Sequence, residues 1–381
     1  QVILLCNSIS DIQGIESINI LKQSFTESKV LIMSDLSDDK HLLEQMSAGA
    51  DGYIKKNSEA DELFFGIKKI ASGGCYIGSE YAVSIINKLQ DKKNDIYITG
   101  SNARLLSGEL ATLLGGRTIE FKVYSLSYRE YILFHRLKDE DESLRKYSLY
   151  GGLPFLINLK LEDEVVFEYL KNIYNTIVLR DIVYRHSLRN IYFLEQLIRF
   201  LADNTGSLFS AKSISDFLKS QKVMMPHNQV QSYTGYLSDA FLVHRVMRYD
   251  ISGKRFFETG EKFYFENLGI RNSVVGYKPG DRAKIIENLV YNELLYRGYE
   301  VKTGWKGNRE IDFIATKDNE TKYIQATLTL DNDAAIAREF GNLLDIDDNY
   351  PKFVISTDMQ YRNTVEGVEH INLRKFLVNG I

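Results

Sequence analysis

The chain opens with Val2-Ile-Leu-Leu-Cys6, and two further apolar runs follow at Val30-Leu-Ile-Met-Ser34 and Gly52-Tyr-Ile54. Each run is short enough to be a buried strand, and we predict strands at 2–5, 30–33 and 52–54. Between and after them, residues 12–24, 39–48 and 59–72 carry apolar side chains at helical spacing. Alternating strands and helices of this kind predict an α/β unit with a parallel sheet.

The rest of the chain changes character after the polar stretch 90–95. A strand at 96–99, a helix through residue 113 and a strand near 118–123 are predicted first, and the pattern is then helical from 126 to about 189. Three helices (191–203, 211–220 and 227–241) and two strands (244–250 and 255–265) predict a winged helix. A helix at 285–297 and strands at 299–304, 310–316, 321–329 and 352–356 predict a final α/β domain.

Composition narrows the class of protein. The 381 residues carry a net charge of −4, with 44% hydrophobic and 26% charged residues, which gives no bulk reason to bind nucleic acid. Two cysteines and six scattered histidines show no metal-ligand spacing, so we expect no metal site of that type. No apolar run approaches the roughly 18 residues of a membrane span. The chain starts without Met or a signal-peptide layout, so we expect a cytoplasmic protein whose N-terminal segment has been lost or removed.

The first 85 residues or so resemble a receiver domain of the NarL/LuxR response-regulator type. The resemblance rests on the apolar runs quoted above, on Gly14, and on the segment Ala48-Gly-Ala-Asp-Gly-Tyr-Ile-Lys-Lys56. In that family the strand before the Gly that corresponds to Gly14 ends in the Asp that accepts a phosphoryl group. Here Cys6 stands at the position of that Asp. Ser34 and Lys56 match the switch hydroxyl and the phosphate-pairing Lys. Because a thiol cannot replace a carboxylate that binds Mg²⁺, we expect no phosphorylation, and we expect Cys6 to be a small buried core residue rather than a redox sensor.

A second resemblance covers about residues 95 to 381. It rests on motifs that occur in order: Asp95-Ile-Tyr-Ile-Thr-Gly-Ser-Asn102-Ala-Arg104, Gly115-Gly-Arg117, Leu126-Ser-Tyr-Arg-Glu130 and Tyr150-Gly-Gly-Leu-Pro154. Together these are similar to the sensor-1 strand and lid of bacterial and archaeal AAA-type P-loop ATPases.

This resemblance implies a set of nucleotide-site residues. Asn102 would be the polar sensor near the γ-phosphate, and Arg117 would stabilise the transition state. Gly151, Gly152 and Pro154 would form the lid turn that approaches the nucleotide. The cofactors implied are ATP and Mg²⁺.

The printed sequence holds no GxxxxGK[ST] motif before residue 95, nor the strand-end acid that binds Mg²⁺. The nearest string, Gly206-Ser-Leu-Phe-Ser-Ala-Lys-Ser213, lies inside the winged-helix pattern, and we interpret Ser210 as a helix N-cap. We therefore expect an ATPase-family chain that binds no nucleotide alone and is non-catalytic.

Residues 285–329 resemble the core of PD-(D/E)XK nucleases. Glu287 or Glu293 lies on the first helix of that core, and Asp312 lies on a strand. Gln325 replaces the second metal-binding acid and Thr327 replaces the Lys, so an inactive nuclease fold is expected.

The predicted order of domains is a partial receiver-like unit (1–90), the C-terminal part of an AAA-type core with a helical lid (95–190), a winged helix (191–275) and a PD-(D/E)XK-like domain (280–381). The leading hypothesis is a non-catalytic ATPase relative that acts through protein partners, through a second copy of itself, or through nucleotide-linked contacts. Alternatives are an ATPase whose P-loop comes from another chain, a winged-helix DNA binder and a degenerate response regulator. The predicted recognition helix, 227–239, contains no Lys or Arg, which weakens the DNA alternative.

Overall fold

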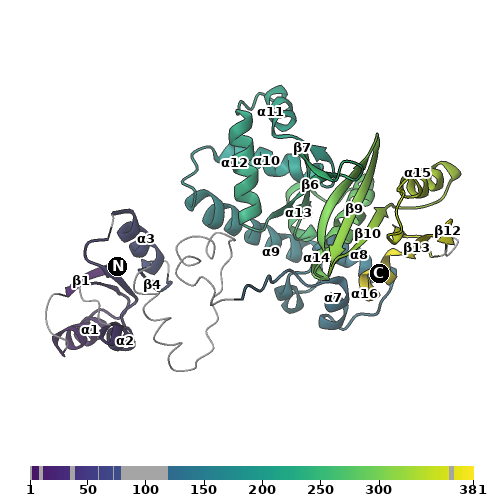
Figure 1. Ribbon diagram of the computed structural model, residues 1–381. Helices are drawn as coiled ribbons and strands as arrows, with labels where there is room; N and C mark the ends of the chain where they lie inside the picture. The colour runs from purple at the N-terminus through teal and green to yellow at the C-terminus, as the bar shows by residue number, and fades with distance from the viewer. Residues whose placement is uncertain are drawn as a thin grey trace. The chain divides into compact units, whose positions relative to one another are not determined.

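The computed structural model describes residues 2–7, 12–34, 39–58, 60–71, 73–78, 119–359 and 364–381. The chain divides into two compact units, Gln1–Glu120 and Phe121–Ile381 (Figure 1).

The first unit is built on a four-stranded parallel sheet in the order β1-β2-β3-β4. Its core lies on both faces of β2, with Val30 and Ile32 packed on one side and Leu31 on the other. Both faces are covered by apolar contacts, which explains why the strands are continuous apolar runs. The predicted parallel α/β unit is confirmed. Its elements are β1 (Val2–Asn7), α1 (Ile12–Ser24), β2 (Lys29–Ser34), α2 (Asp39–Ser47), β3 (Gly52–Lys55), α3 (Ala60–Ala71) and β4 (Tyr76–Ile77).

The second unit begins with helices. α7 starts at a capping box, in which Ser127 and Glu130 satisfy each other's backbone N–H groups. Ser210 caps α11 with Ser213, as expected from the sequence. The described helices include none with the length and apolar content that crossing a bilayer needs. The first helices of this unit are α7 (Tyr128–Phe134), α8 (Asp141–Tyr150), the 3₁₀ turn η1 (Pro154–Asn158), α9 (Asp163–Thr176), the π-helix η2 (Ile177–Tyr184), α10 (Ile191–Asp203), α11 (Ala211–Ser220) and α12 (His227–Asp239).

A nine-stranded mixed sheet, in the order β12-β13-β11-β10-β9-β8-β6-β7-β5, occupies the rest of this unit. In Figure 1, α10, α11 and α12 gather near β6 and β7, and α15 lies near β13. The strands are β5 (Leu208–Phe209), β6 (Val243–Asp250), β7 (Arg255–Phe265), β8 (Glu300–Lys306), β9 (Arg309–Lys317), β10 (Glu320–Ala326), β11 (Lys352–Ser356), β12 (Thr364–Val365) and β13 (Val368–Asn372). The accompanying helices are α13 (Leu268–Val275), the 3₁₀ turn η3 (Pro279–Asp281), α14 (Arg282–Tyr296), α15 (Asp333–Leu344) and α16 (Leu373–Asn379).

One short pairing joins the β6–β7 hairpin to the C-terminal strands. β6 runs parallel to β8 over three residue pairs, from Arg248↔Thr303 to Asp250↔Trp305. The Arg248 guanidinium carbon lies 4.1 Å from the centre of the Trp305 ring, which adds a cation–π contact across the same joint. The hairpin and the C-terminal strands therefore form one sheet.

The predicted strand near 118–123 is wrong for its described residues, because 119–123 form no strand. Ile119, Phe121 and Val123 are 82%, 77% and 93% exposed. An apolar alternation makes a strand only where a neighbouring strand completes its hydrogen bonds and covers one face, and no described strand does so here. The strand and helix predicted at 96–113 lie outside the described residues.

Candidate functional site

The second unit contains a buried lysine that is surrounded by carboxyl groups. Lys262, on β7, is 2% exposed. Its Nζ lies 2.7 Å from Glu287 Oε1, 2.5 Å from Glu310 Oε1 and 3.6 Å from Asp312 Oδ1. An ammonium that far from water persists only when paired, and here it has three partners.

Three elements supply this acid–lysine centre. Glu287 lies on α14, whereas Glu310 and Asp312 are two residues apart on β9 and therefore point to the same face. On β7 the same period places Tyr264 beside Lys262, and its hydroxyl donates to Glu287 Oε1 at 2.7 Å. Glu287 thus receives hydrogen bonds from both a cation and a phenol.

Asp312 is bound into the sheet as well as into the centre. Its Oδ2 accepts the Ala326 N–H at 2.9 Å, and its own N–H donates to Gln325 Oε1 at 2.7 Å. The Gln325 amide then donates to Glu339 Oε2 on α15 at 3.2 Å. Gln325, which was predicted to replace a second metal-binding acid, therefore connects β9, β10 and α15 as a neutral side chain.

Burial and charge determine where the protons reside. Burial alone would lower the pKa of Lys262, but the charges of Glu287, Asp312 and Glu310 outweigh it and hold that pKa above its usual value. Burial, and then the negative charge of Glu287, raise the pKa of Asp312 well above its usual value. At neutral pH the lysine is charged, and Asp312 is the carboxyl that burial and repulsion favour in its protonated form.

The position of Lys262 determines whether the acids of this centre are available to a metal ion. Among the described residues, no group of three or more His, Cys, Asp or Glu side chains is placed to hold a metal ion. The acids that could turn toward a cation already surround the ammonium. Lys262 was missed by sequence analysis. It lies between Glu261 and the apolar run Phe263-Tyr-Phe265, a pattern that does not distinguish it from a solvated lysine. Of the two candidates on the first helix, Glu287 belongs to the centre and Glu293 lies elsewhere on α14.

The glycines of the predicted lid turn, Gly151 and Gly152, pack against other parts of the chain. Gly151 has φ +73°, and a Cβ there would lie 2.3 Å from Asn267 Oδ1. A Cβ on Gly152 would lie 2.2 Å from the Leu126 carbonyl oxygen. Pro154 follows as the first residue of η1. These contacts account for the Gly-Gly pair within the described residues, and their role toward a nucleotide stays a prediction.

The receiver-like residues lie at the side of the first sheet where the strands have their carboxyl ends. Cys6, Ser34 and Lys56 are at or just beyond the carboxyl ends of β1, β2 and β3, and the Lys56 N–H donates to the Ser34 carbonyl at 3.1 Å. Ser34 is fully buried. The expectation that Cys6 is buried is wrong, because its thiol is exposed. β1 is the edge strand of the described sheet and pairs only with β2 there, so its side chains are less covered.

Asn102 and Arg117, the predicted sensor and charge-stabilising residues, lie outside the described residues.

Two protein-family models match parts of the chain. Residues 78–132 match the AAA domain, and residues 141–281 match a domain of unknown function, DUF8612. An uncharacterized protein of Haemophilus influenzae is 35% identical over 372 residues, which cover 96% of this chain and 88% of that protein. Coverage of this extent reaches across both units.

Two further relatives match shorter parts. The uncharacterized protein MJ1544 of Methanocaldococcus jannaschii is 29% identical over 250 residues, covering 62% of this chain and 56% of that protein. The oxygen regulatory protein NreC of Staphylococcus epidermidis is 26% identical over 89 residues, covering 23% of this chain and 41% of that protein. The chain thus has an AAA-type part and a part similar to response regulators.

Proposed function

We propose, on the premise that this chain belongs to one family with the Haemophilus influenzae protein, that it is an AAA-type protein acting through nucleotide-linked contacts with a protein partner. On this proposal it neither hydrolyses ATP unaided nor cuts nucleic acid. The AAA match over 78–132 supports the link to nucleotide. The printed sequence holds no GxxxxGK[ST] motif, which supports a chain that does not hydrolyse ATP with its own residues.

The position of Lys262 carries the non-cutting part of this proposal. The order α14-β8-β9-β10-α15-β11 supports a PD-(D/E)XK-like fold, in which two carboxylates bind the metal and a lysine lies near the attacking water. Here the ammonium of Lys262 fills the space between Glu287 and Glu310, and Gln325 is hydrogen-bonded on both sides. These contacts support a core that is held together by an internal cation.

Titration of labelled ATP with Mg²⁺ tests the nucleotide part. We expect no hydrolysis by the purified chain, and binding that strengthens when an intact homologue is added. Asn102→Ala should remove that gain, whereas Arg145→Ala, at an exposed ion pair on α8, should leave it unchanged. Hydrolysis by the chain alone that is lost in Asn102→Ala would contradict the proposal that the chain is non-catalytic.

A plasmid-cleavage assay with Mg²⁺ or Mn²⁺ tests the nuclease-like part separately. We expect no cleavage by the unaltered chain or by Asp312→Asn. Metal-dependent cleavage by the unaltered chain that disappears in Asp312→Asn would overturn the inactive assignment.

The similarity to NreC favours a second candidate, a degenerate response regulator. Ser34 and Lys56 lie on one edge of the sheet, but Cys6 takes the place of the acceptor Asp. We propose that this unit would act by protein contacts without phosphorylation. Incubation with radiolabelled acetyl phosphate should leave the chain unlabelled, and acid-labile labelling would contradict this view.

A further inference from the structure

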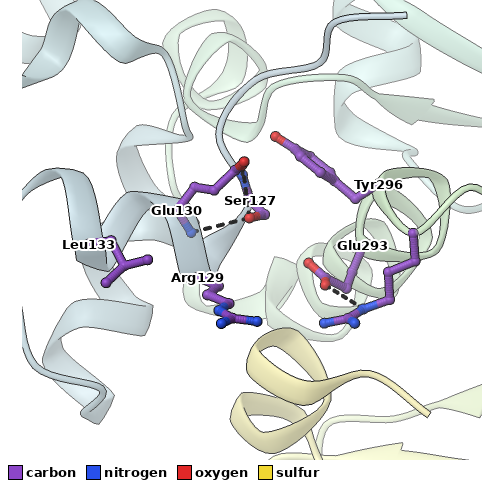
Figure 2. Close-up of a pocket in the computed structure, with 7 residues that line it drawn as sticks. Ser127, Arg129, Glu130, Leu133, Glu293 and Tyr296 are labelled. Atoms are coloured by element: carbon purple, nitrogen blue, oxygen red, sulfur yellow. Dashed lines mark hydrogen bonds and ion pairs between the residues drawn. The ribbon is translucent and has the colours of Figure 1, made fainter.

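A pocket with a volume of about 380 Å³ opens between α7 and α14 (Figure 2). It is separate from the acid–lysine centre. Arg129 and Glu130 reach it from α7, and Glu293, Tyr296 and Arg297 line it from α14 or the residue after it. Both walls belong to the second unit.

Both acids of this pocket already have hydrogen-bond or ion-pair partners within the chain. Glu130 Oε2 accepts hydrogen bonds from the Ser127 N–H at 2.9 Å and from the Ser127 hydroxyl at 3.0 Å. Glu293 is 4% exposed, and its Oε1 lies 2.7 Å from Arg297 Nε. Burial raises the pKa of Glu293 to about 7, against the lowering effect of Arg297, so near neutral pH this carboxyl is often uncharged.

The two guanidinium groups of the pocket differ in their partners. That of Arg297 pairs with Glu293 and donates from Nη1 to the Asn379 carbonyl at 3.2 Å. Arg129 is exposed and makes no hydrogen bond or ion pair with any residue that the structure describes. Figure 2 shows its side chain on the α7 side of the pocket, across from Glu293 on α14. The Tyr296 hydroxyl is buried and lies beside the Glu130 carboxylate in Figure 2, and burial, followed by the charge of Glu130, raises its pKa.

The charges of the lining side chains indicate which ligands the pocket favours. Arg129 and Arg297 contribute two positive charges and Glu130 one negative charge. With Glu293 protonated the sum is +1, and with Glu293 ionised it is zero. Guanidinium groups suit oxygen anions because they present several N–H donors in one plane.

We propose that this pocket binds an oxyanion, the carboxylate or phosphate group of a small molecule, between Arg129 and Arg297. Protonation of Glu293 then strengthens binding by removing a negative charge from the wall. The proposal does not depend on the AAA part binding ATP. The charged and titratable groups around Glu293 are Arg129 and Glu130 from α7, Tyr147 from α8, Glu266 after β7, and Tyr296 and Arg297.

Equilibrium dialysis of the full chain against radiolabelled sulfate, at fixed ionic strength, tests the site. Sulfate keeps the same charge between pH 6 and pH 8, so a change in its affinity reports on the protein. We expect saturable binding by one site, weakened about tenfold in Arg129→Gln, the order expected for one charged hydrogen-bonding group. Arg145→Gln is the matched control, because it removes an exposed arginine that does not line the pocket. Competition by succinate and by inorganic phosphate then separates a carboxylate site from a phosphate site.

Glu293→Gln separates a ligand site from a structural role. It imitates the protonated carboxyl, so at pH 8 it should bind sulfate as tightly as the unaltered chain does at pH 6, and its affinity should no longer change with pH. The far-ultraviolet circular dichroism of each variant confirms folding. The proposal is overturned by an absence of saturable sulfate binding, or by sulfate affinity that is the same in Arg129→Gln and in the unaltered chain.

Discussion

Replacing Lys262 with methionine removes the cation of the acid–lysine centre and keeps a side chain of similar length. Three carboxyl groups within 3.6 Å of Nζ would then face one another without a counter-charge. Removing one partner of a buried ion pair typically costs about 3–5 kcal/mol. Because a domain is stable by only about 5–15 kcal/mol, Lys262→Met should remove a large part of the free energy of unfolding of the second unit.

The loss should depend on pH in a definite direction. The raised pKa of Lys262 means that its stabilising contribution is complete below the unfolded-state pKa of about 10.4 and disappears only as pH rises through the higher folded-state value. The unaltered chain therefore keeps this contribution at both pH 5 and pH 8. In Lys262→Met the carboxyls, with Asp312 already raised in pKa, take up protons more readily. The deficit should be smaller at pH 5 than at pH 8.

Urea unfolding followed by tryptophan fluorescence measures the effect. Trp305 is the only tryptophan of the chain and lies on β8, so the signal reports on the second unit. Lys278→Met is the control, because its ion pair with Asp203 is exposed and should contribute less than about 1 kcal/mol. A loss in Lys262→Met no larger than that of Lys278→Met, or an equal loss at both pH values, would refute the electrostatic reasoning.

Three further outcomes are expected. Gly152→Ala should destabilise the second unit by about 2 kcal/mol or more in urea, because its Cβ would collide with the Leu126 carbonyl, whereas Gly280→Ala has open space and should change stability little. Glu293 has a folded-state pKa of about 7 against an ordinary value near 4.3, so stability should fall as pH rises between these values; Glu293→Gln should flatten that decline in thermal melts at pH 5 and pH 8. In gel-shift assays at low salt, the double variant Lys254→Ala/Arg255→Ala and the unaltered chain should give the same result with duplex DNA, because α12 carries no Lys or Arg. Salt-sensitive DNA binding that is lost in the double variant would favour the DNA-binding alternative.

Secondary structure with a clear period could be predicted from the sequence. The helix predicted at 191–203 is α10 with the same bounds, and the strand at 255–265 is β7. In contrast α15 was not predicted, although Asn332 caps its first turn. Its first half, Asp333-Ala-Ala-Ile-Ala, is poor in large apolar side chains, and its packing on β9, β10 and β11 is a tertiary contact that the local sequence does not reveal.

The acid–lysine centre was predicted only in part. Glu287 and Asp312 were found because they match a known pattern, and the structure places them around one ammonium. Lys262 was not found, because nothing local distinguishes a buried lysine from a solvated one on an amphipathic strand. Its partners lie 25 to 50 residues further along the chain, and only tertiary structure brings them to it. The prediction that Cys6 is buried was wrong for a related reason, because the exposure of a side chain on β1 depends on which strands flank that strand.

The three-residue joint between β6 and β8 limits how this protein can be divided. A fragment ending at η3 would leave β6 with bare backbone donors and acceptors open to another strand, and it would keep Lys262 while losing Glu287, Glu310 and Asp312. The reciprocal fragment would hold three crowded acids without their cation. In this chain the helices before the hairpin and the strands after it should therefore unfold together, because each fragment would expose groups that the other one pairs.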